Sequence, residues 1–401
     1  MRILLAPVGT RGDVQPMLAL ALGLRAKGHV VTFCAPPNFK SWLAPLGFAF
    51  WSSGLDFQAF VNEIGTRVHR ALPALRQQIH VQFEAMAPLA ADADMIVGAS
   101  VHCAGLSLGQ KLGIPYAYAL FSPSLLPSGG HPSPTCPWQR LPRWLNRATW
   151  AANRWLWNRL FRRALNGERA GLGLGPVRDT WGHILSAPLL LAVEPALARP
   201  PADSSFHGVQ TGSWFLPEPE PLGPEIESFL AAGPPPVFVG FGSMTDRRPD
   251  STTSLILKAA RAAGQRVILS RGAAGLGAAA RDEAVHIVDQ LPHAQLFPRV
   301  AAVVHHGGAG TTAAAARAGV PQVIVPHLLD QFFWGERIRL LGLGPAPIPR
   351  PRLGVRRLAR ALVACVGDVE IPTSARTFAV GMVQDGVARG IAAVEALASG
   401  A

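Results

Sequence analysis

The sequence predicts an α/β protein made of two Rossmann-like domains that face each other across a cleft. Short apolar runs alternate with helical patterns from residue 1 to about 120, and the same alternation returns from 237 to 325. A proline-rich stretch separates the two halves. Such alternation is typical of parallel sheets with crossover helices, and a chain of 401 residues has room for about two to three domains.

The first half carries its strand and helix patterns in regular succession. Strands are expected over 3–8, 30–35, 95–99, 116–121 and 189–193, and helices over 17–26, 104–112 and 144–164. Pro16 marks the expected start of the first helix, because proline fits the first turn. We therefore expect the N-terminal domain to cover residues 1–205.

The second half repeats this order after the prolines that crowd 195–224, which predict a semi-rigid linker over 206–224. Strands are expected over 237–241, 266–269, 285–288, 301–305 and 322–325, and helices over 252–263, 311–318 and 332–341. The C-terminal domain then covers 225–380. Residues 373–398 are expected to form one or two helices with a weak stretch from Gly381 to Gly390. Residues 381–401 then form a C-terminal helix, and packing back on the N-terminal domain is one arrangement open to it.

Composition narrows the possible partners. The chain has 37 basic and 25 acidic residues and a net charge of +12, but its arginines are scattered without the basic runs of a nucleic-acid groove. Nucleic acid is therefore not an expected partner, while anionic lipid or a small anion remains open. The four cysteines lie far apart, which argues against a disulfide framework or zinc site and favours a reducing, cytoplasmic location. No apolar run of about twenty residues predicts a membrane span.

The strongest motif is the stretch 305–312, which reads His-His-Gly-Gly-Ala-Gly-Thr-Thr between an apolar strand and an alanine-rich helix. Glycines let the backbone approach a ligand, and the free amides and dipole of a helix start favour negative charge. Histidine and threonine beside the turn add donors for a diphosphate. The alternative is a tight turn that binds nothing.

A second motif, Pro-His-Leu-Leu-Asp-Gln over 326–331, follows the next strand and therefore lies at the same sheet edge. The Asp330 carboxylate accepts hydrogen bonds and the Gln331 carboxamide both donates and accepts, so the pair is suited to adjacent sugar hydroxyls. The alternative is that Asp330 only caps the following helix.

A third motif, Gly-Thr-Arg-Gly-Asp over 9–13, follows the first strand. It does not match the G-x-G-x-x-G dinucleotide fingerprint, and the second strand ends without an acid for a ribose, so NAD binding is disfavoured. Asp13 at the mouth of the cleft is a candidate general base for a hydroxyl. A helix cap is the ordinary alternative.

These motifs, together with Asp13-x-x-Pro16, Gly-Phe-Gly-Ser over 240–243 and Leu-Pro-His over 291–293, occur in this order in glycosyltransferases of the GT-B fold. The sequence resembles the branch that holds bacterial antibiotic and macrolide glycosyltransferases and sterol glucosyltransferases. The resemblance implies that an N-terminal domain binds the acceptor and a C-terminal domain binds the nucleotide sugar. It assigns the donor diphosphate to Ser243, His306, Gly308, Gly310 and Thr311, the base to Leu291, the donor sugar to Asp330 and Gln331, and the general base to Asp13.

The resemblance also implies the reaction class: inverting transfer of a hexose from a UDP- or dTDP-sugar to a hydroxyl of a hydrophobic polyketide-, macrolide- or sterol-like molecule, with no metal and no cofactor besides the nucleotide sugar. One departure is visible, because Ala273 stands where relatives often carry a tryptophan after Ser-Arg-Gly. That leaves the choice between uridine and thymidine open. A membrane-associated glycolipid or sterol transferase, a sugar-nucleotide epimerase and an inactive binding protein are the competing interpretations, and either a monomer or a homodimer is expected.

The acceptor side is assigned to Thr10, His102, Trp144 and Trp155. His102 follows a strand and is a candidate to assist Asp13, although a packed histidine is the simpler interpretation. The segment 144–164 carries two apolar stripes, with Arg143 and the five arginines of the segment between them, which fits either a roof over an apolar acceptor pocket or a helix lying on anionic lipid. Asp92 and Asp94 precede a strand and are interpreted as a turn rather than a metal site.

Overall fold

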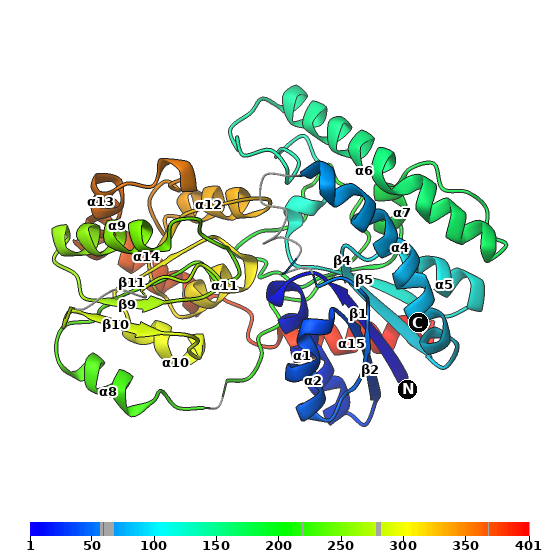
Figure 1. Ribbon diagram of the computed structural model, residues 1–401, viewed down its shortest axis with the longest axis horizontal. Coiled ribbons are helices and arrows are strands. Elements are labelled where there is room, and N and C mark those ends of the chain that lie inside the picture. Colours follow the sequence, from blue (N-terminus) through cyan, green and yellow to red (C-terminus); the bar gives the residue numbers. More distant parts are fainter. Residues whose placement is uncertain (57–58, 60–67, 219, 278–281, 368, 401) are drawn as a thin grey trace.

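The computed structural model describes residues 1–56, 59, 68–218, 220–277, 282–367 and 369–400. Its two halves lie side by side, each built on a parallel sheet with helices on both faces (Figure 1). The predicted pair of Rossmann-like domains is thereby confirmed. None of the described helices combines the length and the apolar composition that crossing a bilayer requires.

The N-terminal sheet has seven strands in the order β3-β2-β1-β4-β5-β6-β7. They are β1 (Arg2–Val8), β2 (Val30–Ala35), β3 (Ala49–Ser52), β4 (Met95–Ser100), β5 (Tyr116–Leu120), β6 (Leu189–Leu191) and β7 (Gly208–Gln210). Buried apolar side chains fill β1, β4 and β5, as expected of strands covered on both faces. The strand order reverses direction between β1 and β4, which makes that point the natural ligand edge.

Helices cover both faces of this sheet. They are α1 (Arg11–Ala26), α2 (Lys40–Leu43), α4 (Val68–Ala91), α5 (Ala104–Leu112), α6 (Arg143–Gly171) and α7 (Thr180–Leu185). The prediction that the first helix starts after Pro16 was wrong, because α1 begins at Arg11 and contains Pro16. Contacts of Asp13 with Thr10 begin the helix earlier, and proline is accommodated near its start.

The C-terminal sheet has five parallel strands in the order β10-β9-β8-β11-β12. They are β8 (Val237–Gly240), β9 (Val267–Ser270), β10 (Val285–Val288), β11 (Ala302–His305) and β12 (Gln322–Ile324). The helices around it are α8 (Pro224–Ala231), α9 (Pro249–Ala262), α10 (His293–Leu296), α11 (Ala309–Arg317), α12 (Gln331–Leu340), α13 (Val355–Gly367) and α14 (Glu370–Val380). Here the strand order reverses between β8 and β11.

The last helix, α15 (Gly386–Ser399), leaves the C-terminal domain and packs against α1 (Figure 1). A methyl group on Gly23 of α1 would lie 2.5 Å from Cδ1 of Ile391, so the glycine allows the close approach. Glu395 accepts from Lys27 at 3.2 Å and pairs with His29 at 2.9 Å. The end of the chain therefore completes the N-terminal core.

The boundary between the domains differs in detail from the expected linker. Strand β7 lies inside the stretch 206–224, and Trp214 is buried in the N-terminal core, so that domain reaches beyond residue 205. Residue 219 of the expected linker and residue 401 of the expected C-terminal helix lie outside the described part of the chain. The remaining linker runs from Trp214 to the start of α8 at Pro224.

Side chains from both domains meet across the cleft. Arg140 pairs with Glu336 of α12 at 3.0 Å, and Arg337 donates to the Leu197 carbonyl through Nε at 3.0 Å and Nη2 at 2.9 Å. The first turns of α1 and α11 belong to helices that contact one another. This arrangement brings the two ligand edges together.

Candidate active site

The turn between β11 and α11 is braced by a buried histidine. His305 is fully buried; its Nδ1 accepts from the Gly307 amide at 3.1 Å and its Nε2 lies 2.9 Å from Gln322 Oε1. Burial lowers the pKa of His305 to about 4, so the ring is neutral and donates through Nε2 to Gln322. Gly307 has a φ of +91°, and a Cβ there would approach Ile324 to 2.7 Å, so only glycine fits this turn.

The second histidine, His306, lies between two glycines. A Cβ on Gly242 would lie 2.9 Å from its Cε1, and a Cβ on Gly308 would lie 2.5 Å from its Nε2. Its Nδ1 is buried and has no hydrogen-bond partner among the described residues. Burial, assisted by neighbouring histidines, lowers the pKa of His306 to about 3, so the ring is a neutral donor and acceptor rather than a cation.

The start of α11 is left open. Its N-cap is Gly308, which offers no side chain, so the amides of residues 309–311 have no internal acceptor. The amide and the hydroxyl of Thr312 both donate hydrogen bonds to the Gly308 carbonyl at 2.9 Å. Gly310 and Thr311 therefore lie at an uncapped helix start, beside the reversal point of the sheet, where free amides and the helix dipole favour an anion.

Asp330 occupies the N-cap position of α12, but it does not cap the helix. Its Oδ2 accepts from the Trp334 indole N–H at 3.0 Å. Burial is the main cause that raises the pKa of Asp330 to about 7; the negative charge of Asp13 adds to the rise, and the Trp334 hydrogen bond opposes it. The carboxyl groups of Asp330 and Asp13, one from each domain, are therefore close enough to interact electrostatically across the cleft.

Gln331 is used inside its own loop. Its side chain is 4% exposed, its Oε1 accepts from the amides of His327 at 2.8 Å and Leu328 at 3.1 Å, and its Nε2 faces Met244 Sδ at 3.3 Å. The sequence-based interpretation that it both donates to and accepts from a sugar does not match this geometry. Gln331 instead shapes the loop that presents Asp330.

Asp13 lies in the first turn of α1 and contacts three donors. Its Oδ2 accepts from the Thr10 amide at 2.7 Å and the Thr10 hydroxyl at 3.3 Å, and its Oδ1 accepts from the Ser100 hydroxyl. A Cβ on Gly9 would lie 2.1 Å from Oδ2, so glycine makes room for the carboxylate. Burial raises the pKa of Asp13, while the Ser100 and Thr10 hydrogen bonds oppose that rise.

Ser100 is a site residue that the sequence analysis missed. It ends β4 with a φ of 63°, in the left-handed region that non-glycine residues seldom adopt. Val8 and Ser100 pair in the parallel register of β1 and β4, and the Tyr118 hydroxyl donates to the Ser100 carbonyl. This unusual backbone places the Ser100 hydroxyl on the Asp13 carboxylate. A serine at the end of a predicted strand was the only sequence signal.

The remaining donor-side residues lie around the same edge. Ser243 follows β8, and Gly272 of the turn after β9 packs on Gly242, where a Cβ would meet the Gly242 carbonyl oxygen at 2.7 Å. Leu291 lies half-buried in the loop after β10. Beside it, Gln290 accepts from Arg11 of α1, a contact between the domains that sequence reasoning did not find.

Comparisons with known proteins identify the family of this chain. Residues 3–119 match the glycosyltransferase family 28 N-terminal domain, and residues 255–394 match the C-terminal domain of erythromycin biosynthesis protein CIII-like proteins. Glycosyltransferase GtfE of Amycolatopsis orientalis is 39% identical over 86% of each chain. The chain belongs to the GT-B glycosyltransferases.

Other relatives and structures of this glycosyltransferase family extend the match. A sterol 3-beta-glucosyltransferase of Arabidopsis thaliana is 33% identical over 90% of this chain and 62% of its own length. The crystal structure of glycosyltransferase VinC in complex with dTDP superimposes with a TM-score of 0.69 over the whole of both chains at 19% identity. The predicted resemblance to antibiotic and sterol glycosyltransferases is thereby confirmed.

The acceptor side of this glycosyltransferase differs from the sequence-based assignment. His102 is 1% exposed, its Nε2 accepts from the Gly105 amide at 2.9 Å, and burial lowers its pKa to about 3. It is a packed histidine and does not face the cleft as a base. Trp144 and Trp155 are 69% and 67% exposed on the outer face of α6, so they do not roof a pocket. Thr10 holds Asp13.

The carboxylates at the opposite sheet edge are structural. The Arg2 amide donates to Asp94 at 2.7 Å, and the Arg2 side chain pairs with Asp94 at 3.3 Å and with Asp92 at 3.8 Å. This is the predicted turn. Within the described ranges, no cluster of three or more histidine, cysteine or acidic side chains is arranged to hold a metal ion.

Proposed function

We propose that this glycosyltransferase transfers a hexose from a UDP- or dTDP-sugar to a hydroxyl of a hydrophobic natural product or sterol-like molecule, with inversion at the anomeric carbon. The observation that carries the proposal is the pairing of an uncapped helix start at Gly308 with a half-buried carboxylate at Asp13 on the facing domain. One edge suits a leaving diphosphate, and the other suits a hydroxyl that must lose a proton.

The reaction is one displacement. Asp13 takes the proton of the acceptor hydroxyl, and that oxygen forms a bond to the anomeric carbon. The bond from this carbon to the diphosphate oxygen breaks, and its electron pair leaves with the nucleoside diphosphate. The carboxyl later returns its proton to water. A raised Asp13 pKa makes the carboxylate a stronger base, and the Ser100 and Thr10 hydrogen bonds keep it ionised.

The leaving group is stabilised by the C-terminal domain. The amides at the start of α11 and the Thr311 hydroxyl donate to the developing charge, and the neutral His306 supplies an N–H in a buried setting where such bonds are strong. Ser243 lies in the loop that follows β8, beside the same reversal point. Asp330 accepts from a donor-sugar hydroxyl while Gln331 holds its loop.

The nucleotide part of the donor is a pyrimidine nucleoside diphosphate. Among the relatives, a dTDP-epi-vancosaminyltransferase of Amycolatopsis orientalis is 34% identical, and a vancomycin aglycone glucosyltransferase of the same organism is 37% identical. These names support a deoxysugar or glucose donor and a natural-product acceptor. The loop around Leu291 faces the base, and a single half-buried leucine accepts either uracil or thymine.

The test is direct product analysis. The enzyme is incubated with an α-linked dTDP- or UDP-hexose and a panel of glycopeptide aglycones, hydroxylated polyketides and sterols. We expect nucleoside diphosphate release only with an acceptor, and a β-glycoside in the proton spectrum of the product. Retention of the α-configuration would contradict the single displacement, and conversion of the nucleotide sugar into an epimer without acceptor would contradict transfer.

A further inference from the structure

The outer face of α6 presents exposed tryptophans on a helix of 29 residues. At 3.6 residues per turn, four side chains fall on one stripe: Trp144, Ala148, Ala151 and Trp155. All four are exposed, and Trp138 in the preceding loop is 70% exposed. Large aromatic side chains are costly to leave in water, so this stripe calls for an explanation.

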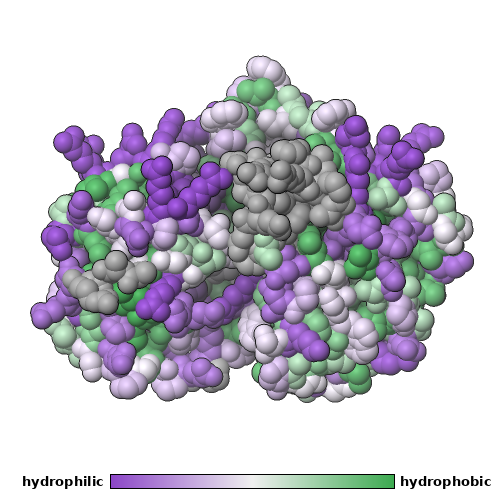
Figure 2. Space-filling model, in the orientation of Figure 1, coloured by the Kyte–Doolittle hydropathy of each residue, from purple (hydrophilic) through white to green (hydrophobic). Residues whose placement is uncertain are grey.

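Arginines flank this stripe on both sides. From 143 to 167 the sequence has six arginines and no acidic residue. Arg143 and Arg154 pair with Asp203 at 3.3 Å and Asp179 at 3.8 Å. The other four arginines are exposed and form no ion pair in the described ranges: Arg162 donates to the Arg178 carbonyl, while Arg147, Arg159 and Arg163 form neither an ion pair nor a hydrogen bond there. Figure 2 shows hydrophilic side chains standing out along the upper right edge, where Figure 1 places α6.

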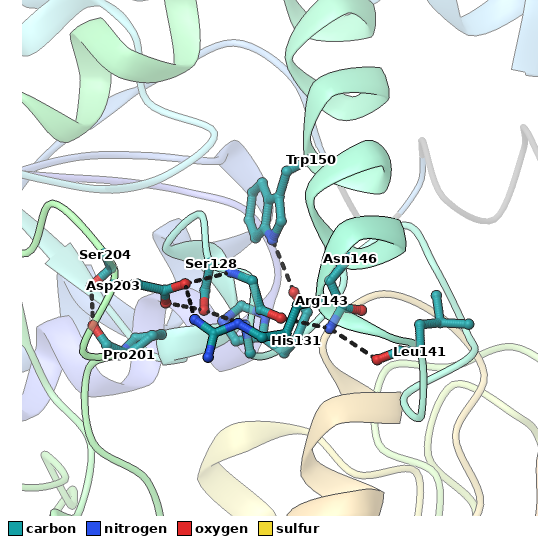
Figure 3. A network of polar contacts seen from close by, with 11 residues as sticks. Ser128, His131, Leu141, Arg143, Asn146, Trp150, Pro201, Asp203 and Ser204 are labelled. Atoms are coloured by element: carbon teal, nitrogen blue, oxygen red, sulfur yellow. Dashed lines mark hydrogen bonds and ion pairs between the residues drawn. The ribbon is translucent and has the colours of Figure 1, made fainter.

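The opposite face of α6 is already packed, so the outer stripe is not an unfinished core. Trp150 and Phe161 are buried, and the Trp150 indole donates to the His131 carbonyl at 3.2 Å. Figure 3 shows how a polar network fixes the start of the helix. Asp203 accepts from Ser128 at 2.5 Å, and Asn146 donates to the Gly129 carbonyl at 2.9 Å. The stripe is therefore held rigidly outward.

We propose that this face of α6, with Trp138, binds the surface of an anionic lipid bilayer. Its unpaired arginines complement anionic headgroups, and tryptophan prefers the boundary between headgroups and acyl chains. The stripe is too narrow for insertion beyond that boundary, which fits reversible adsorption. Each basic residue near such a surface strengthens binding about fivefold, and salt weakens it.

Membrane docking here would place the cleft beside the lipid. Trp138 lies two residues before Arg140, which contacts Glu336 of the facing domain. The N-terminal end of α6 is therefore next to the contact between the domains, where an apolar acceptor partitioned into lipid arrives without crossing water. This consequence rests on the proposed function, whereas the binding itself does not.

The experiment is sedimentation of the full chain with vesicles. Phosphatidylcholine vesicles are compared with vesicles that also contain phosphatidylglycerol, at low and at physiological salt. We expect binding only to the anionic vesicles, weakened by salt. Replacing Arg147, Arg159 and Arg163 with serine should weaken it about a hundredfold, and W144S together with W155S about tenfold.

Matched controls change the same charge elsewhere. Arg352, Arg356 and Arg360 are exposed on the C-terminal domain, and their replacement by serine should leave vesicle binding within about threefold of the wild type. Thermal shift by dTDP and UDP on every variant reports whether the fold and nucleotide site are intact. Equal losses in the two arginine triples, or no binding by the wild type, would overturn the proposal. So would a dimer in size-exclusion chromatography that W155S dissociates, because the face would then join two copies of the chain.

Discussion

Helices α1 and α11 begin with the same local geometry, but one helix start carries a carboxylate and the other has open amides. Each follows a central strand of its sheet at the point where the strand order reverses, and each starts with a glycine before the helix. In α1 the Asp13 carboxylate accepts a hydrogen bond from the Thr10 amide at 2.7 Å, so a negative side chain already lies at the positive end of the helix. In α11 the N-cap is Gly308, and the first amides stay open.

The same local geometry can therefore serve two roles. A helix start favours negative charge, and the sequence decides whether that charge belongs to the chain or to a ligand. On α1 the built-in carboxylate can act on a proton. On α11 the vacant amides can hold a diphosphate. The predictions below test whether the two helix starts are separable, one affecting turnover and the other nucleotide affinity.

The largest expected effect comes from Asp13→Asn. The amide keeps an acceptor for Thr10, so α1 should remain intact, but it cannot take a proton. Turnover should fall on the order of a thousandfold while dTDP and UDP affinity stay within about threefold. Steady-state rates and calorimetric titration measure both. Equal losses in rate and affinity would show that the two helix starts are not separable.

Next in size is Gly308→Ala. The backbone angles of Gly308 suit alanine, but the new Cβ would lie 2.5 Å from His306 Nε2 and displace the imidazole. Nucleoside diphosphate affinity should fall about a hundredfold, since a buried donor and the turn geometry are lost together. Gly167→Ala in α6, where nothing lies within 4 Å of the added methyl, is the matched control. Unchanged affinity in Gly308→Ala would remove α11 from the donor site.

A smaller effect is expected from Ser100→Ala, which tests how Asp13 is held. The lost hydrogen bond should lower turnover about tenfold at neutral pH. Because Ser100 favours the charged form of Asp13, its removal should raise the Asp13 pKa and move the acid limb of the rate profile to higher pH. Ser100→Gly removes the hydroxyl and relieves the positive φ. It should shift the limb equally, whereas a purely structural defect would lower the rate at every pH.

The smallest effect concerns Asp330 and stability. Its pKa is raised from 3.8 to about 7 in the folded state, so its protonation stabilises the fold at low pH, and that contribution is lost as the pH rises through about 7. Between pH 6 and 7 the wild type should lose about 1 kcal/mol relative to Asp330→Asn. Histidines with lowered pKa values act in the opposite direction in both proteins, so only the difference is diagnostic. Denaturant titration measures the free energy of unfolding of both proteins at each pH. If the two curves run parallel between pH 6 and 7, the raised Asp330 pKa is contradicted.

The sequence was sufficient for the architecture because the signals were local. Parallel strands buried on both faces read as apolar runs, and glycines marked the ends of helices such as α5, where Gly113 has a φ of 69°. The short strands β3 and β7 were missed, because three or four residues, partly exposed at a sheet edge, carry no apolar run. The start of α1 was misplaced because Pro16 is a stronger local signal than the tertiary contacts of Asp13.

The site could be predicted where a single sequence motif contains all the interacting residues. It could not be predicted where the interacting residues come from two different strands. The turn over 305–312 contains its own glycines, histidines and helix start. Ser100 meets Asp13 only through the register of β1 and β4, which sequence spacing does not encode. Likewise, the outer position of Trp144 and the inner position of Trp150 depend on which side of α6 packs on α4 and α7, and both stripes are aromatic.

The crossing of α15 has a consequence for biosynthesis. Ile391 and Val394 are buried in the same cluster as α1 and β1, although nearly the whole chain separates them in sequence. A nascent N-terminal domain therefore emerges from the ribosome with the α15-contacting apolar side chains of α1 uncovered, and they stay so until residue 394 is free. Translation of the entire C-terminal domain precedes the burial of those side chains, so a chaperone has its longest opportunity to bind there.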